Sequence, residues 1–191
     1  DDICKIDIGD GVSFEVKDSA VIMDEMEYPG IRFTLNVNMD GLVTPIKIDI
    51  STGDVITPRA IEYQYSFILE NRTATLLSYN LETVLAEKLQ TILVRELVNT
   101  RMRDFYDIHV LLTLYEKSID VSVLKDAFKA TCKKRNTLDL ISYSKQAVER
   151  IRSSNALSNL WIDYQNKYVY AQDISYKDAV NSVEKLLDKL S

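Results

Sequence analysis

The chain has 191 residues, of which 46% are hydrophobic and 27% are charged, and its formal net charge is −6. This composition is ordinary for a soluble globular protein, and the length allows one sizeable core or two small lobes. The sequence has no apolar run long enough to span a bilayer, and its acidic balance argues against a protein that coats nucleic acid over its whole surface.

Glycine and proline are confined to the first third of the chain, because all five glycines and all three prolines lie within residues 1–58. A chain that stops using its two strongest turn formers has changed from hairpins to helices. We therefore expect an α+β fold in which a β-rich lobe, residues 1–77, precedes a C-terminal helical bundle, residues 78–191.

The β-rich lobe shows the alternation of apolar and polar residues that is typical of half-buried strands. Residues 31–38 alternate over eight positions, and Ile46, Ile48 and Ile50 are expected to face inward from a later strand. The expected strands are 12–16, 20–23, 31–38, 44–50, 61–69 and 73–77, with turns at 17–19, 28–30 and 39–41.

One acidic residue, Asp49, lies between two isoleucines near the end of a predicted strand. An aspartate in this position either faces a cleft at the end of the strand or accepts hydrogen bonds from nearby backbone N–H groups. The pattern alone leaves both interpretations open.

Two consecutive helices are predicted from apolar residues that recur at helical spacing, one over 82–97 and one whose apolar face runs from Phe105 to Tyr115, with a junction near Asn99 and Thr100. Each apolar arc also contains charged residues. A charge that points at a core loses hydration and needs a cation, an anion or hydrogen bonds. The inward or border residues are Glu82, Lys88, Arg95, Asp104 and Asp107.

These inward charges have two interpretations. They form a structural salt-bridge cluster between the helices, with Arg101 or Arg103 as a further partner, or they belong to a functional site. The pattern alone does not choose between the two.

Beyond residue 115 the chain is predicted to be helical at 120–132, 141–151, 157–168 and 175–190, with Ser175 as the N-cap of the last helix. The aromatic residues between 161 and 170 are expected to be core rather than a surface for base stacking. Two distant cysteines and one histidine predict neither a disulfide framework nor a zinc site.

The two helices carry motifs that resemble those of the AbiEii-type nucleotidyltransferase toxins of bacterial type IV toxin–antitoxin and phage-defence systems. The first motif is Tyr79-x-x-Glu82-x-x-x-Ala86-Glu87-Lys88-Leu89, and the second is Arg101-x-Arg103-Asp104-x-Tyr106-Asp107. Arg103 stands where the second motif usually has lysine. The triplet Ile48-Asp49-Ile50, followed by residues 51–54 and Pro58, is similar to a later part of the same family.

The resemblance is expected to cover most of residues 12–115, because the family's first motif is missing. That motif is a Gly-Ser dipeptide followed by Asp-x-Asp, and this chain has no Gly-Ser pair. The nearest early carboxylates, Asp7 and Asp10, have one residue too many between them. The chain is thus expected to be either part of a longer protein or a decayed copy, and inactive alone.

The resemblance implies transfer of a nucleotide from a nucleoside triphosphate to RNA, tRNA ends in some relatives, with Mg²⁺, in the bacterial cytoplasm. It also implies an antitoxin that acts without a tight complex. Lys88 would contact the triphosphate, Asp104 or Asp107 would orient the nucleophile or hold Lys88, and Glu82 would brace the site. Asp49 would be a metal ligand, and Arg95, Arg101 and Arg103 would bind substrate.

Two other functions are compatible with the sequence. The chain could be a non-catalytic interaction or scaffold module in which the inward charges are structural. It could instead bind RNA through the basic residues Lys129 and Lys133–Arg135, with Arg150 or Arg152 nearby, and such binding would be salt-sensitive and independent of Lys88.

Overall fold

The computed structural model describes residues 2–22 and 30–190, and the chain divides into two compact units, Asp1–Asp54 and Val55–Ser191. The predicted turn at 28–30 and the end of the predicted strand at 23 fall outside the described residues, apart from Gly30. The secondary structure changes from strand to helix between Ser78 and Leu81. The domain boundary expected at 77/78 stays a prediction. The hairpin of β4 (Ile61–Ser66) and β5 (Thr73–Ser78) belongs to the same compact unit as the helices.

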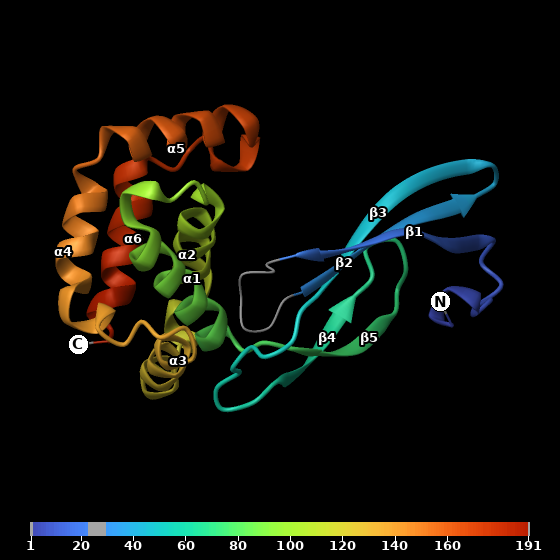
Figure 1. Cartoon of the computed structure of the whole chain (residues 1–191), viewed down its shortest axis with the longest axis horizontal. Helices are drawn as coiled ribbons and strands as arrows, with labels where there is room; N and C mark the ends of the chain where they lie inside the picture. The colour runs from blue at the N-terminus through green and yellow to red at the C-terminus, as the bar shows by residue number, and fades with distance from the viewer. Residues whose placement is uncertain (1, 23–29, 191) are drawn as a thin grey trace. The chain divides into compact units, whose positions relative to one another are not determined.

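The first unit contains a short 3₁₀ helix, Ile3–Lys5, and an antiparallel sheet of three strands in the order β1–β2–β3 (Figure 1). The turn between β2 and β3 has only two residues, Asp40 and Gly41, whose φ angles are 48° and 82°. Positive φ at both positions matches the right-handed twist of a hairpin, and an Asp-Gly pair tolerates it. The strands are β1 (Val12–Ile22), β2 (Gly30–Met39) and β3 (Leu42–Ile50).

The turn predicted at residues 17–19 is wrong, because β1 continues through it as one strand. Pairing with β2 passes from Val16–Leu35 to Asp18–Thr34, so Lys17 is an extra residue in the ladder, a β-bulge. A bulge accommodates one extra residue without ending the strand, so a short polar stretch need not be a turn.

The isoleucines of β3 lie on the same face of the sheet as the apolar residues of β2, as the alternation predicts. The expectation that they face a core is only partly met, since Ile48 is 45% exposed and Ile50 is 52% exposed. Among the described residues of this unit, Leu35 on the central strand is the hydrophobic side chain that is buried. A three-stranded sheet offers few neighbours on its faces, so its central strand is buried first.

The second unit begins with a hairpin of two antiparallel strands and continues with helices, which confirms the α+β class. The predicted strand 61–69 ends three residues early. The segment before the hairpin is held to the first helix, because Asn80 Nδ2 donates to the carbonyl of Thr57 over 2.7 Å. The elements are β4 (Ile61–Ser66), β5 (Thr73–Ser78), α1 (Leu81–Arg95), α2 (Met102–Tyr115), α3 (Val121–Lys134), α4 (Leu140–Arg152), α5 (Asn155–Lys167) and α6 (Tyr176–Asp188).

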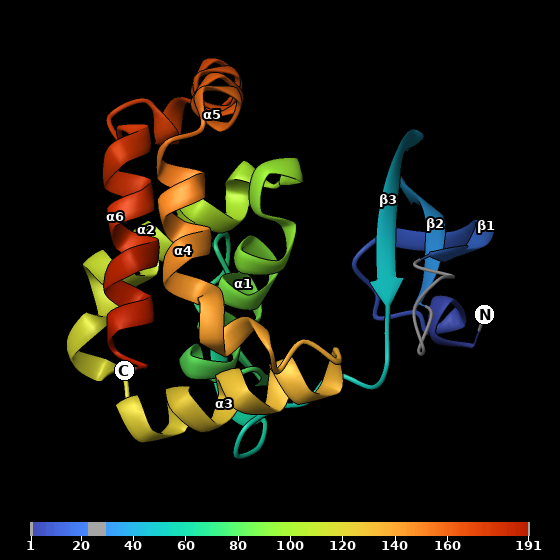
Figure 2. The same ribbon diagram turned by 60° about the vertical axis from the view of Figure 1, so that its left-hand side comes forward.

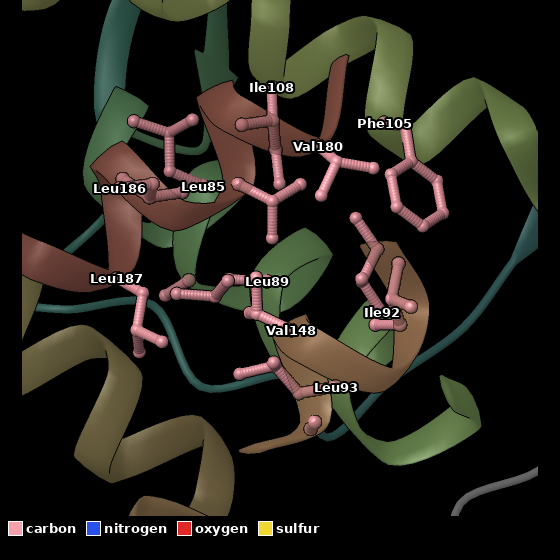
Figure 3. Packing of buried hydrophobic residues seen from close by; sticks show 14 of the residues in the cluster. Leu85, Leu89, Ile92, Leu93, Phe105, Ile108, Val148, Val180, Leu186 and Leu187 are labelled. Carbon is pink, nitrogen blue, oxygen red and sulfur yellow. The ribbon is translucent and has the colours of Figure 1, made fainter. Parts of the chain in front are cut away.

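The helices form a bundle in which α5 crosses one end and α3 crosses the other (Figures 1 and 2). The core lies where α1, α2, α4 and α6 meet, and Figure 3 shows Leu89 of α1 near Val148 of α4. Trp161 is buried, as predicted, and its Nε1 donates to the carbonyl of Ile174 over 2.9 Å. Within the described residues, we find no helix with the length and apolar character needed to cross a membrane.

Candidate functional site

The junction between α1 and α2 places the end of one helix beside the start of the next. Helix α1 stops at Glu96, whose φ of 40° is unusual for a residue with a side chain. Its carboxylate is held from α4 by Arg150, with two contacts of 2.6 and 2.7 Å. Asn99 then accepts a hydrogen bond from the backbone N–H of Arg101 over 2.9 Å, which leads the chain into α2.

Lys88 of α1 binds two carboxylates of α2. Its Nζ donates to Asp104 Oδ1 over 3.1 Å and to Asp107 Oδ2 over 2.6 Å. The two aspartates are three residues apart, so they lie on the same face of the helix, one turn from each other. Asp104 is only 2% exposed, whereas the side chains of Asp107 and Lys88 are 23% and 21% exposed.

Two arginines of the second motif extend this cluster toward solvent. Arg101 Nε lies 2.8 Å from Asp104 Oδ2, and Arg103 Nε lies 3.8 Å from Asp107 Oδ2. Arg101 Nη2 donates to Asp104 Oδ1 over 3.4 Å, whereas the contact of its Nε with Oδ2 is an ion pair that leaves this buried oxygen without a hydrogen bond. Both guanidinium groups are more than half exposed and can reach a ligand.

The cluster forms part of the wall of a pocket of about 590 Å³. Lys88, Asp104, Asp107 and both arginines line it from α1, α2 and their junction. The opposite wall comes from α5, with Asp163, Tyr164 and Lys167, and from Tyr168 just beyond it. A pocket of this size with convergent charged groups is suited to a small polar ligand.

Glu82 and Arg95, both predicted members of the site, have other surroundings. Glu82 is 7% exposed, and its Oε1 accepts a hydrogen bond from the backbone N–H of Asp120 over 2.9 Å, just before α3. Arg95 is exposed at the last turn of α1, so its expected place at the border of the core is wrong. Neither residue lines the pocket, and their roles in a site stay predictions.

Asp49 belongs to the first unit, where its carboxylate forms a double contact with Arg32 of the neighbouring strand. Arg32 Nε and Nη2 donate to the two oxygens of Asp49, each over 2.7 Å. The bound guanidinium keeps the pKa of Asp49 below its usual value. A metal ion would have to replace this arginine, so the assignment of Asp49 as a metal ligand stays a prediction.

The residues described here do not fit a Mg²⁺ site. No group of three or more acidic, histidine or cysteine side chains comes together within residues 2–22 and 30–190. Asp104 and Asp107 converge on an ammonium group instead, and a cation at that point would be repelled by Lys88. The cluster is therefore suited to binding an anion beside Lys88 rather than a metal ion.

Some basic residues of the run near residue 135 form contacts within the fold. Arg135 Nη1 donates to Gln90 Oε1 over 2.6 Å, and Arg152 donates to Asn181 and Glu184 over 2.7 Å each. Arg150 binds Glu96, as described above. These arginines join helices to one another, so RNA binding in this region would have to depend on its lysines.

The α5 wall of the pocket was not predicted from the sequence. Asp163, Lys167 and Tyr168 fall within the predicted helix 157–168, and the two family motifs given above do not include them. The run of aromatic residues between 161 and 170 was the available signal, but spacing along one helix cannot show which side chains reach a pocket formed with another helix.

A protein-family model matches most of the chain. The family model described as "Nucleotidyl transferase AbiEii toxin, Type IV TA system" matches residues 1–189, which extends well beyond the expected coverage of residues 12–115. No curated protein and no solved structure matches the chain.

Proposed function

The chain belongs to the AbiEii nucleotidyl transferase toxin family of type IV toxin–antitoxin systems, and from that premise we propose that residues 88–107 form part of a site for transfer of a nucleoside monophosphate to RNA. The observation that supports this most is the position of Lys88 at the wall of the pocket. An ammonium group has three N–H donors. Two of them bind Asp104 and Asp107, which leaves the third for a phosphate oxygen.

In the proposed transfer, a hydroxyl oxygen of RNA bonds to the α-phosphorus of a nucleoside triphosphate. The bond from that phosphorus to the bridging oxygen breaks, pyrophosphate leaves, and the hydroxyl proton passes to a carboxylate. Lys88 offsets part of the negative charge of the triphosphate. Arg101 and Arg103, both more than half exposed, bind further phosphate oxygens.

The two aspartates have different roles in this proposal. Asp104 is almost fully buried and is suited to hold Lys88 in place. Asp107 is more exposed and lines the pocket, so it is the better candidate to orient the hydroxyl and accept its proton. A conservative Asp104→Asn change is then expected to weaken triphosphate binding, whereas Asp107→Asn is expected to leave binding largely intact.

The family generally uses a divalent metal, and the described carboxylates do not form a site for one. The Asp-x-Asp pair of the family's first motif is also missing from the sequence. We therefore propose that these 191 residues bind a nucleotide but do not transfer it alone.

Calorimetric titration of each nucleoside triphosphate, in buffer with Mg²⁺, tests the proposal. We expect binding to the unaltered chain and loss of binding in Lys88→Ala. Lys185→Ala is the matched control, because Lys185 pairs with Glu116, just beyond the C-terminal end of α2, and does not line the pocket. Equal affinity of the Lys88→Ala and unaltered chains would remove Lys88 from the site.

A scaffold module is the second candidate, and one observation favours it. Lys88 is already satisfied by two carboxylates, as a purely structural ion cluster would be. This function predicts that no triphosphate binds at millimolar concentration, whereas replacement of Lys88 still lowers stability. Binding and stability measurements on the same variant therefore separate the two candidates.

A further inference from the structure

Four tyrosines form a cluster on the α5 side of the pocket. Tyr164 lies 4.7 Å from Tyr168, and Tyr168 stacks on Tyr170 at 5.4 Å with an angle of 27° between the rings. Tyr106 of α2 joins the cluster at 4.7 Å from Tyr170. Tyr164 and Tyr168 line the same pocket as Lys88.

The sequence predicts that the aromatic residues of this region belong to the core. The cluster is instead only partly buried. Trp161 beneath it is buried, but Tyr170 is 53% exposed, and Tyr164 and Tyr168 are only partly buried. Aromatic rings left partly exposed at the wall of a charged pocket provide flat surfaces on which any base can stack.

Cations lie within reach of these rings. Lys167 Nζ is 5.4 Å from the centre of the Tyr168 ring, and Arg103, which lines the same pocket, is 78% exposed. A carboxylate, Asp163, also lines this part of the pocket and would repel a phosphate. This part of the pocket therefore combines aromatic rings and cations with one carboxylate that would repel a phosphate.

Tyr164 lines the pocket, and its hydroxyl is paired within the cluster. It is within 3.1 Å of the hydroxyl of Tyr170. Burial, this hydrogen bond and the nearby charge of Asp107 all raise the pKa of Tyr164, so its hydroxyl keeps its proton. Tyr164 can donate a hydrogen bond to a base or sugar but does not act as a base itself.

We propose that this tyrosine cluster binds one nucleotide, with its base against Tyr168 and its phosphate at Lys167 and Arg103. The inference rests on the proposed function, because the bound nucleotide is a participant in that transfer. Two molecules carry the same chemistry: the free nucleoside triphosphate and the end of a single-stranded RNA.

Binding measurements on the full chain test this inference. Fluorescence anisotropy with a labelled single-stranded RNA of about eight nucleotides, within the usual range for such sites, measures the RNA arm. Calorimetry measures the triphosphate arm. The variants are Tyr168→Ala and Tyr168→Phe, and the matched control is Tyr115→Ala, an exposed tyrosine on α2 that does not line the pocket.

We expect Tyr168→Ala to weaken binding about tenfold or more in one arm, because loss of base stacking has effects of this order. Tyr168→Phe keeps the ring and is expected to bind within about threefold of the unaltered chain by the same reasoning. A loss in the RNA arm assigns the cluster to the acceptor, and a loss in the triphosphate arm assigns it to the donor. Unchanged binding in both arms overturns the proposal.

Asp163→Asn gives a readout that a structural role would not produce. Removing the opposing carboxylate is expected to strengthen binding about twofold, most clearly at low salt. Weaker or unchanged binding contradicts the placement of the phosphate. The Lys88→Ala titration tests the proposed function, and the Tyr168 variants test the tyrosine cluster. A failure of one proposal is therefore distinguishable from a failure of the other.

Discussion

Replacement of Lys88 by methionine should lower the stability of the helical unit by about 2–3 kcal/mol. Methionine keeps the apolar stem of the side chain but removes the ammonium group that binds Asp104 and Asp107. Asp104 is 2% exposed, so its charge would stay away from water with Arg101 as its remaining cation. Breaking a buried ion pair costs about 3–5 kcal/mol, and the remaining arginine reduces that loss.

Urea unfolding followed by the fluorescence of Trp161 measures this change. Trp161 is the single tryptophan of the chain and lies in the core of the helical unit, so its signal reports that unit. We expect a lower midpoint with an unchanged slope. Lys185→Met is the control, because it removes a solvent-exposed pair with Glu116, and its midpoint should not move measurably.

A double variant tests whether the buried charge of Asp104 causes the loss of stability. Asp104→Asn added to Lys88→Met removes the buried charge that has lost Lys88 as a partner and should recover about half of the lost stability. A loss of less than about 0.5 kcal/mol in Lys88→Met, the value of an exposed pair, would refute the description of the cluster as a buried ion network.

Three further changes have expected outcomes. Glu96→Gln should destabilise the protein at neutral pH, because hydrogen bonds from Arg150 lower the pKa of Glu96 in the folded state. A lowered pKa contributes stability above the unfolded value and loses it as the pH falls through the folded value, so unfolding midpoints of the two proteins should converge in acid. Asn80→Ala should cost about 1–2 kcal/mol in urea unfolding, because Asn80 caps α1 and also binds the Thr57 carbonyl. Replacing Lys129 and Lys133 together by glutamine should leave RNA anisotropy unchanged; a loss larger than that of Tyr168→Ala would favour the basic run as the RNA contact.

The helical part of the fold was predictable because each helix carries its own local signals. Apolar spacing located α1 to within about two residues and the junction before α2 near Asn99, and Ser175 does cap α6 by accepting a hydrogen bond from the N–H of Asp178. The pairing of Lys88 with Asp104 and Asp107 was also among the predicted possibilities. The hydrogen bonds of a helix join residues that are close in sequence, so the position of a helix can be predicted from local sequence signals.

The sheet was predicted less well, because strands depend on partners that are distant in sequence. Residues 17–19 contain the polar residues of a turn, and only pairing with β2 shows that the strand continues with a bulge at Lys17. Alternation likewise identified the face that carries Ile48 and Ile50, but not how much of that face is covered. Periodicity gives the orientation of a side chain, whereas burial depends on what packs against it.

The same distinction explains the candidate site. Glu82, Lys88 and Arg95 were predicted on one stripe of α1, and they have three different outcomes. Glu82 binds the backbone N–H of Asp120, Lys88 binds carboxylates of α2, and Arg95 is exposed where the helix ends. An inward charge is located by helical geometry, but its partner comes from another element. Lys88 alone among the three also borders the pocket, so nucleotide binding should respond to Lys88→Ala and not to Arg95→Ala, although the pattern in the sequence treats both alike.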